Sequence, residues 1–207
     1  MRNSDAERPR AAVDGVVLAA GRSRRMGAAK PMLGVDDSTF IARVVASLLE
    51  GGCREVVAVI RADAGEVGGA AARAGARVVV NTTPDSEQID SLRLALRNLM
   101  PGAEAAVVLP VDHPLVMAGT VSTVIDAFTR ARPPIARAAH AGTPGHPTLF
   151  SATLFEELLH GELAEGARTT IARHGSETLD VPVDDPGVTA DIDTPEDFRR
   201  HTGGAPS

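Results

Sequence analysis

Four positively charged side chains follow a short apolar segment near the start of the chain. Residues 16–20 are all apolar, Gly21 follows them, and the next nine residues contain the cations Arg22, Arg24, Arg25 and Lys30. The chain as a whole has a formal net charge of −6 at pH 7. Glycine lets backbone N–H groups approach a ligand closely, and cations neutralise phosphate oxygens. This local excess of positive charge therefore predicts an anionic ligand. The alternative is an ordinary strand-to-helix turn with solvated arginines.

Carboxylates form a second group of candidate functional residues. Asp112 lies three residues after the end of the apolar segment 105–109. Asp191 and Asp193 precede an expected helix start at Thr194. Mg²⁺ prefers hard oxygen ligands, and the end of a strand fixes a carboxylate without burying it. We expect Asp191 and Asp193 to alternate onto opposite faces, so that only Asp193 points to the metal. In the alternative interpretation, Asp112 caps the following turn and Asp193 belongs to the helix start.

These residues lie on elements that the hydrophobic pattern predicts. Expected strands are residues 13–19, 55–60, 77–80, 105–109, 135–139, 147–150 and 178–183. Expected helices are a segment capped by Ser38 and ending near Glu50, residues 64–74, a segment with apolar residues from Ile89 to Leu99, residues 120–130, 152–159 and 167–174, and a segment that begins at Pro195 with Thr194 as its N-cap.

Alternation of strands and helices indicates an α/β protein with a mostly parallel sheet that helices cover on both faces. In such sheets, ligands bind outside the carboxyl ends of the strands. Three features follow or end an expected strand: the basic loop that begins after Gly21, the residue Asn81, and the residue Asp112. We therefore expect them to converge at one edge of the sheet.

Length and composition restrict the remaining possibilities. We expect one domain over residues 13–202, a loose N-terminal tail at 1–12 and a frayed C-terminal tail at 203–207. Cys53 is the single cysteine, which excludes a disulfide framework and favours a reducing, cytoplasmic setting, and we expect it to be buried. The negative charge argues against nucleic acid as a partner. No apolar run approaches the ~20 residues of a membrane span, so we expect no membrane partner.

The segment Leu-Ala-Ala-Gly-Arg-Ser-Arg-Arg-Met-Gly-Ala-Ala-Lys, residues 18–30, resembles the signature of the MobA-like nucleotidyltransferases. Within them, the chain is most similar to molybdenum cofactor cytidylyltransferases. This resemblance implies a three-layer α/β/α sandwich with a Rossmann-like sheet of the nucleotide-diphospho-sugar transferase type. It also assigns residues of the basic loop and its surroundings. Contacts with base and ribose are assigned to Leu18, Ala19, Ala20 and Gly21, contacts with the triphosphate to Arg25 and Lys30, and catalytic roles to Arg25, Lys30 and Asp112.

Further segments resemble the same family. Asp112 lies in Leu-Pro-Val-Asp-His-Pro, which resembles an element whose aspartate holds Mg²⁺, and Asp193 is the second metal ligand that we favour. Asn81 and Ser91 are expected at the base, although residues 87–93 keep only the Ser-Leu-Arg end of the family's segment. Ser91 could instead cap a helix. The Gly-His-Pro and Gly-Ala-Arg segments imply that His146, in an exposed loop, and Arg168 contact the acceptor.

The reaction implied is transfer of a nucleoside monophosphate from a triphosphate, with CTP favoured, to a phosphate acceptor, with release of pyrophosphate. Molybdopterin is the favoured acceptor, and handover to a molybdoenzyme would follow. One alternative is a nucleotidyltransferase of the same fold with a sugar phosphate or polyol phosphate acceptor or a guanylyl donor. Another is a non-catalytic, chaperone-like module that binds nucleotide or cofactor. The intact metal pair and cations argue against the latter.

Overall fold

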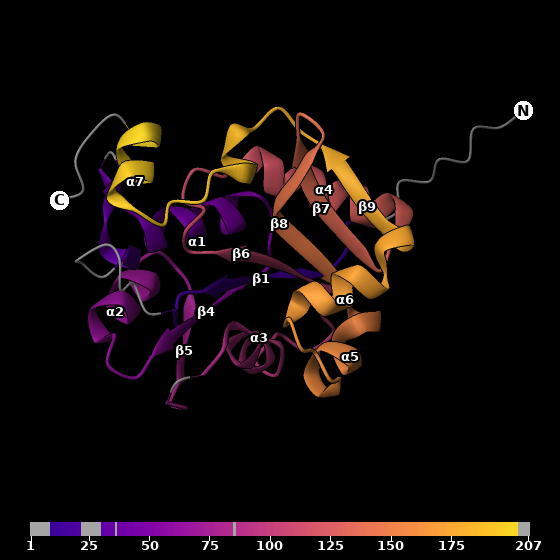
Figure 1. Ribbon diagram of the computed structural model, residues 1–207. Coiled ribbons are helices and arrows are strands. Elements are labelled where there is room, and N and C mark those ends of the chain that lie inside the picture. The colour runs from indigo at the N-terminus through magenta and orange to yellow at the C-terminus, as the bar shows by residue number, and fades with distance from the viewer. Residues whose placement is uncertain (1–8, 22–29, 36, 85, 203–207) are drawn as a thin grey trace, which may run out of the picture.

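The computed structural model describes residues 9–21, 30–35, 37–84 and 86–202, and its centre is a sheet of parallel and antiparallel strands (Figure 1). The strands of this sheet are β1 (Val13–Leu18), β4 (Val56–Arg61), β5 (Arg77–Asn81), β6 (Ala105–Pro110), β7 (Ile135–His140), β8 (Thr143–Ser151) and β9 (Thr178–Pro182). In the described residues, their order is β5-β4-β1-β6-β8-β7-β9. β8 runs antiparallel to β6 and β7, whereas β1 pairs in parallel with β4 and β6. The predicted mostly parallel sheet is confirmed.

Helices cover both faces of the sheet (Figure 1). On one face lie α1 (Phe40–Glu50), α2 (Gly65–Arg73), α4 (Ala118–Ala131) and α7 (Pro195–Thr202), and on the other α3 (Gln88–Leu96), α5 (Phe155–His160) and α6 (Ala167–Arg173). Each face has its own apolar cluster. Val13 and Val17 of β1 belong to the first and Val16 and Leu18 to the second, because successive strand residues point to opposite faces. The fold is therefore a three-layer α/β/α sandwich.

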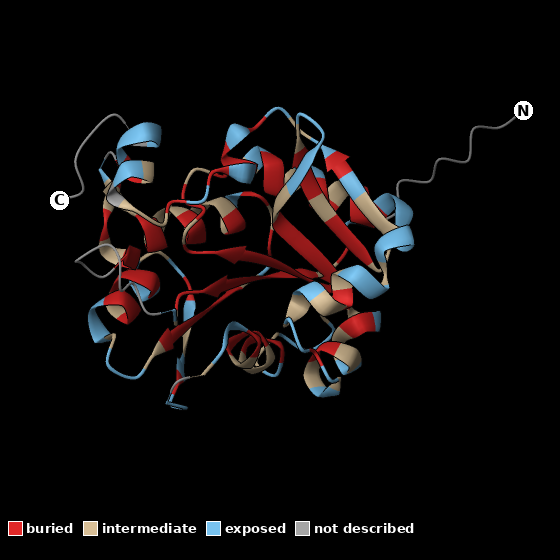
Figure 2. Cartoon of the chain, viewed as in Figure 1, coloured by how far each residue is buried: buried red, intermediate tan, exposed pale blue. Residues whose placement is uncertain are grey.

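Burial follows these layers, with the central strands enclosed and the outer helix surfaces exposed (Figure 2). All six residues of β1 and all six of β6 are buried. Strands covered on both faces are rich in aliphatic residues, which explains a core built without Trp or Tyr. None of the helices in the described part of the chain is both long and apolar enough to cross a membrane.

Short elements complete the chain and revise two predicted boundaries. A separate hairpin is formed by β2 (Gly34–Val35) and β3 (Ser38–Thr39), and single turns form η1 (Lys30–Met32), η2 (Ala152–Leu154), η3 (Gly175–Glu177) and η4 (Pro186–Thr189). Ser38 is not the N-cap of α1, because it pairs with Val35, and Thr39 caps the helix instead. The predicted helix over 152–159 divides into η2 and α5.

The hairpin between β7 and β8 is tighter than predicted. β8 begins at Thr143 instead of Pro147, because Ala141 and Gly142 have φ angles of 48° and 79° and complete the turn by themselves. Two consecutive residues with positive φ match the turn to the twist of the flanking strands. The longer β8 extends as far as the carboxyl end of β6, where Asp112 lies.

The predicted N-terminal tail is too long. Arg10 forms an ion pair of 3.2 Å with Asp126, and Ala11 N donates a hydrogen bond of 3.2 Å to Thr129 Oγ1 on α4. The chain is therefore attached to α4 from Arg10 onward, and residues 1–8 and 203–207 lie outside the described residues. Cys53 is buried as predicted, and burial, with a smaller effect of Asp14, raises the pKa of its thiol to about 12.

Candidate active site

A cavity of about 430 Å³ opens at the carboxyl ends of β1 and β6. The chain leaves β1 toward β4 on one side, and returns from β5 through α3 to β6 on the other. This change of direction leaves a crevice between the two strand ends, the usual ligand position in open α/β sheets. The walls are the end of β1, η1, the start of α3 and the end of β6, and Asp193 from the segment before α7 completes the rim.

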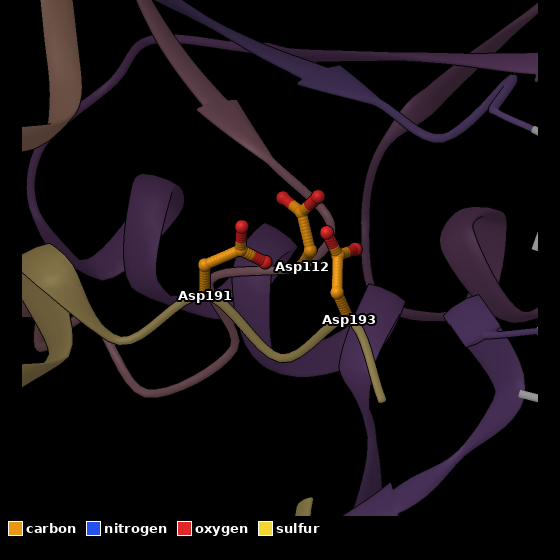
Figure 3. Close-up of side chains that lie close together, drawn as sticks. All are labelled: Asp112, Asp191 and Asp193. Carbon is orange, nitrogen blue, oxygen red and sulfur yellow. The ribbon is translucent and has the colours of Figure 1, made fainter. Parts of the chain in front are cut away.

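Three aspartates meet at this rim (Figure 3). Asp112 follows β6, and Asp191 and Asp193 precede α7; one carboxylate oxygen from each lies within 4.8 Å of the other two. Ile192 N donates a hydrogen bond of 3.0 Å to Asp112 O, which joins the two segments. Partial burial and then the neighbouring charges of Asp112 and Asp193 raise the pKa of Asp191. We refer to these three residues as the aspartate cluster.

The expectation that Asp191 and Asp193 point to opposite faces is wrong. Residues two apart on an extended segment share one face, and it is the residue between them that takes the other. Ile192 is fully buried in the apolar core, so both of its acidic neighbours turn toward Asp112. Asp191 thus belongs to the aspartate cluster, although Asp193 was favoured over it as the metal ligand.

Lys30 lies against this cluster. Its Nζ forms a close ion pair with Asp193 Oδ1 and lies 3.7 Å from Asp112 Oδ2, and its side chain is only 10% exposed. The residue was expected to contact a triphosphate, and it lines the cavity. In the structure, however, its ammonium group faces carboxylates. Arg25, the other cation expected to bind the triphosphate, lies outside the described residues.

The aspartate cluster fits a divalent cation. Asp112 Oδ1 is buried and has no hydrogen-bond partner in the described part of the chain, and the nearest ion-pair contact is His113 Nε2 at 4.0 Å. An unpartnered carboxylate oxygen beside two further carboxylates is a costly arrangement that a hard cation would relieve. The chemistry of the donors, all oxygen, suits magnesium or manganese.

The residues expected at base and ribose divide into two groups. Leu18, Ala20 and Gly21 line the cavity. Ala19 does not: its side chain is 4% exposed and belongs to the apolar core, and its N–H donates to Val59 O at 2.9 Å. Alternation along the end of β1 thus turns Ala19 away from the cavity.

Asn81 also lies behind the cavity wall. Its Nδ2 donates to Ser86 Oγ at 3.0 Å and to Ser91 Oγ at 3.1 Å, and Thr83 N donates to its Oδ1. Ser86 and Ser91 themselves line the cavity. Neither serine caps α3, because Glu87 is its N-cap. Asn81 therefore positions two hydroxyl groups that line the cavity.

His146 lies against His113, the residue that follows Asp112. The His146 ring packs on the ring of His113 with centroids 4.7 Å apart, and burial, together with the neighbouring His113, lowers the pKa of His146 to about 3. His146 is half-buried on β8 instead of lying in an exposed loop, and its imidazole is uncharged at neutral pH. Arg168 is exposed on the first turn of α6 and also contributes to lowering the pKa of His146.

Two residues were missed by the sequence reasoning. His113 adjoins Asp112 in the motif and packs on His146, so its position in the sequence was an available clue. Asp185 is 2% exposed and accepts hydrogen bonds from Met117 N, Thr120 Oγ1 and Gly187 N at 2.9, 2.6 and 2.9 Å. It fixes the segment that leads to the aspartate cluster, and no local pattern distinguishes it from a solvated turn residue.

Comparisons with known proteins agree with this architecture. A model of the MobA-like NTP transferase domain matches residues 15–178. Rv0371c from Mycobacterium tuberculosis H37Rv is 30% identical, with a TM-score of 0.81, over 94% of this chain and 98% of that chain. A complex of Rv0371c with manganese is 29% identical, with a TM-score of 0.76, over 93% and 99% of the two chains.

A nucleotidyl transferase from Methanothermobacter thermautotroptrophicus has the same fold, with 24% identity and a TM-score of 0.79 over 92% of this chain and 96% of that chain. No curated protein matches the sequence. The family match extends from β1 to the start of β9 and includes the strand ends that line the cavity. The chain is therefore a nucleotidyltransferase that belongs to the MobA-like NTP transferase domain family.

Proposed function

We propose that this protein transfers a cytidylyl group from CTP to a phosphate of molybdopterin and releases pyrophosphate. The main support is the position of the aspartate cluster and Lys30 on the rim of the cavity between β1 and β6. The choice of CTP and molybdopterin rests on the resemblance of residues 18–30, 145–150 and 166–168 to molybdenum cofactor cytidylyltransferases.

The proposed reaction is an in-line substitution at the α-phosphorus of the triphosphate. An acceptor phosphate oxygen forms a new bond to this phosphorus, while the bond from the phosphorus to the bridging oxygen of the leaving pyrophosphate breaks. The acceptor is already an anion, so no general base is required. Positioning and charge neutralisation then provide the catalysis.

The aspartate cluster and the positively charged side chains would act on different parts of the triphosphate. Asp112 and Asp193 would hold Mg²⁺, and we add Asp191 as a third ligand because its carboxylate faces the same point. When bound, the metal ion neutralises phosphate charge and lowers the barrier to attack. Arg25 and Lys30 would offset the charge that develops on the leaving pyrophosphate.

The two substrates are proposed to lie on either side of the cluster. The segment from Leu18 to Gly21 would face base and ribose, and the Ser91 hydroxyl group, held by Asn81, would meet the pyrimidine edge. On the acceptor side, Arg168 would bind a phosphate group. His146 would offer a hydrogen bond instead of a positive charge, because its imidazole is uncharged at neutral pH.

Pyrophosphate release tests the proposal directly. CTP, UTP, GTP and ATP are each combined with molybdopterin, a sugar phosphate and a polyol phosphate in the presence of Mg²⁺. We expect the fastest release with CTP and molybdopterin. Release with another pair would assign a different nucleotidyltransferase activity. Binding of a triphosphate without release for any pair would instead indicate a non-catalytic module.

Asp112→Asn provides the matched test of the cluster. It should lower turnover at least about 100-fold, because the metal ion that neutralises charge in the transition state would lose one of its ligands. The free energy of unfolding should change little, since one of three mutually repelling carboxylates is removed. The control is Asp180→Asn on β9, at an edge of the sheet and three strands from β6, whose carboxylate pairs with Arg137. Equal turnover in the two variants would contradict a role of Asp112 in the reaction.

A further inference from the structure

Lys30 is the only lysine of the sequence, although the chain contains 21 residues that are lysine or arginine. It is also the cation in contact with the aspartate cluster, where its Nζ meets Asp193 and lies 3.7 Å from Asp112 Oδ2. An ammonium group is a compact point charge on a flexible stem, whereas a guanidinium group is a planar fork suited to fixed bidentate contacts. The residue type at this position therefore suits a charge that has to move.

We infer that Lys30 is the resident counter-ion of the aspartate cluster, and that a divalent cation must displace its ammonium group in order to bind. The two cations compete, because the ammonium group and the metal ion would both draw on the carboxylates of Asp112 and Asp193. The Lys30 side chain is 10% exposed, whereas those of Asp112 and Asp193 are 29% and 46% exposed, so water screens this competition in part.

The competition has a consequence for the order of binding. Three carboxylates without Lys30 would repel one another, so Lys30 maintains the cluster before the metal arrives. A metal ion that binds alone displaces Lys30 from Asp112 and Asp193. A triphosphate in the cavity would offer anionic oxygens to the displaced ammonium group, because Lys30 also lines the cavity wall. This step rests on the proposed function, and it predicts that metal and triphosphate each strengthen the binding of the other.

Manganese binding to the nucleotide-free protein tests the counter-ion role. Free Mn²⁺ is measured by electron paramagnetic resonance for the wild type and for Lys30→Met. We expect the variant to bind Mn²⁺ about tenfold more tightly, because a competing unit charge about 4 Å from the ligand oxygens is removed. The control is Arg137→Met, which removes one positive charge from the ion pair between Arg137 on β7 and Asp180 on the edge strand β9 and should leave the affinity unchanged.

The wild-type protein offers a second measurement, which does not depend on how a variant folds. Protein labelled with ¹⁵N-lysine has a single side-chain ammonium signal, that of Lys30. We expect addition of Mg²⁺ to shift this signal and to speed the exchange of its protons with water, as the contact with Asp193 breaks. Addition of CTP after Mg²⁺ should shift it again and slow the exchange.

The outcomes separate this inference from the proposed function. Unchanged or weaker Mn²⁺ binding in Lys30→Met, or an ammonium signal that does not respond when Mg²⁺ binds, would overturn the counter-ion role. Neither measurement with metal alone involves nucleotide transfer. If the protein releases pyrophosphate from no triphosphate, but Lys30→Met binds Mn²⁺ more tightly than the wild type, the proposed function is refuted and the counter-ion role of Lys30 is supported.

Discussion

The carboxylate of Asp185 lies outside the cavity, yet its replacement should disturb both the fold and the aspartate cluster. It is 2% exposed and accepts three hydrogen bonds, two at the start of α4, from Met117 and Thr120, and one from Gly187 in η4. In Asp185→Asn, one oxygen still accepts from Gly187 N, but the amide nitrogen faces the donors of α4. The Thr120 hydroxyl group can rotate and accept, whereas the Met117 N–H cannot.

The expected loss in the free energy of unfolding is about 3 kcal/mol, from one buried unpaired N–H and from the weakening of hydrogen bonds to a charged acceptor. This is a large share of the total stability of an ordinary domain, about 5–15 kcal/mol. Asp185 also precedes the segment that ends at Asp191 and Asp193, so Mn²⁺ binding to Asp185→Asn should be weaker than to the wild type.

Urea unfolding followed by circular dichroism measures the first effect, and Mn²⁺ titration the second. The matched control is Asp180→Asn, whose carboxylate is 46% exposed and pairs with Arg137; an exposed pair of this kind contributes about 1 kcal/mol or less. If Asp185→Asn and Asp180→Asn lose the same small amount, with equal slopes against urea, the three hydrogen bonds do not stabilise the protein as argued. Unchanged Mn²⁺ affinity would show that Asp185 does not support the aspartate cluster.

Two further predictions concern the elements around the site. In Gly145→Ala, the new Cβ would lie 2.1 Å from the backbone oxygen of Val188, so thermal unfolding should show a loss of about 1–3 kcal/mol; Gly119→Ala in α4 meets no atom within 4 Å and should gain about 0.4–1 kcal/mol. A stable Gly145→Ala protein would contradict the close approach of β8 to η4. A second prediction is a dependence on pH of the 2.9 Å contact between Glu157 and His174. The hydrogen bond that the His174 ring donates to Glu157 raises the pKa of His174 above its usual 6.5. Against the opposing effect of burial, hydrogen bonds from His174 and Arg173 lower the pKa of Glu157 below 4.5. The stabilisation from His174 is complete below pH 6.5 and is lost as the pH rises through its raised pKa, whereas that from Glu157 is complete above pH 4.5 and is lost as the pH falls through its lowered pKa. Glu157→Gln should therefore cost more stability at about pH 5.5 than at about pH 9, and equal losses in urea unfolding at the two pH values would exclude the charged pair.

The layers of the fold could be predicted from the sequence because strands buried on both faces have a local signature. Residues 105–110 are all apolar and all buried, and they form β6 with the predicted start. The extent of β8 could not be predicted in the same way. It depends on a turn in which Ala141 adopts a positive φ, which alanine rarely does and which only pairing of the two strands stabilises.

The candidate site was predicted to the extent that strand ends determine it. Asp112, Leu18 and Gly21 reach the cavity because each follows or ends a strand of the parallel sheet. Ala19 was assigned to base and ribose by the family resemblance, and Asn81 was placed at the site as the residue that ends a strand. The direction of their side chains, toward the core and toward two serines, was not considered. Side chains two apart on a strand share one face, so Ala19 is expected to pack in the same apolar cluster as Val17.

Contacts between distant parts of the chain explain the rest. Lys30 and Asp193 are 163 residues apart, and no local pattern predicts that they meet. Their contact follows from the cost of the cluster itself. Three carboxylates whose oxygens lie within 4.8 Å are unfavourable without a cation, so the fold must supply opposing interactions before a metal ion binds. Lys30 supplies charge, and the hydrogen bond from Ile192 N to Asp112 O fixes the backbone. Asp185 holds the approach to both Asp191 and Asp193 from outside the cavity. The stability of the metal-free site and its affinity for a metal ion should therefore change in opposite directions when Lys30 is replaced, and in the same direction when Asp185 is replaced.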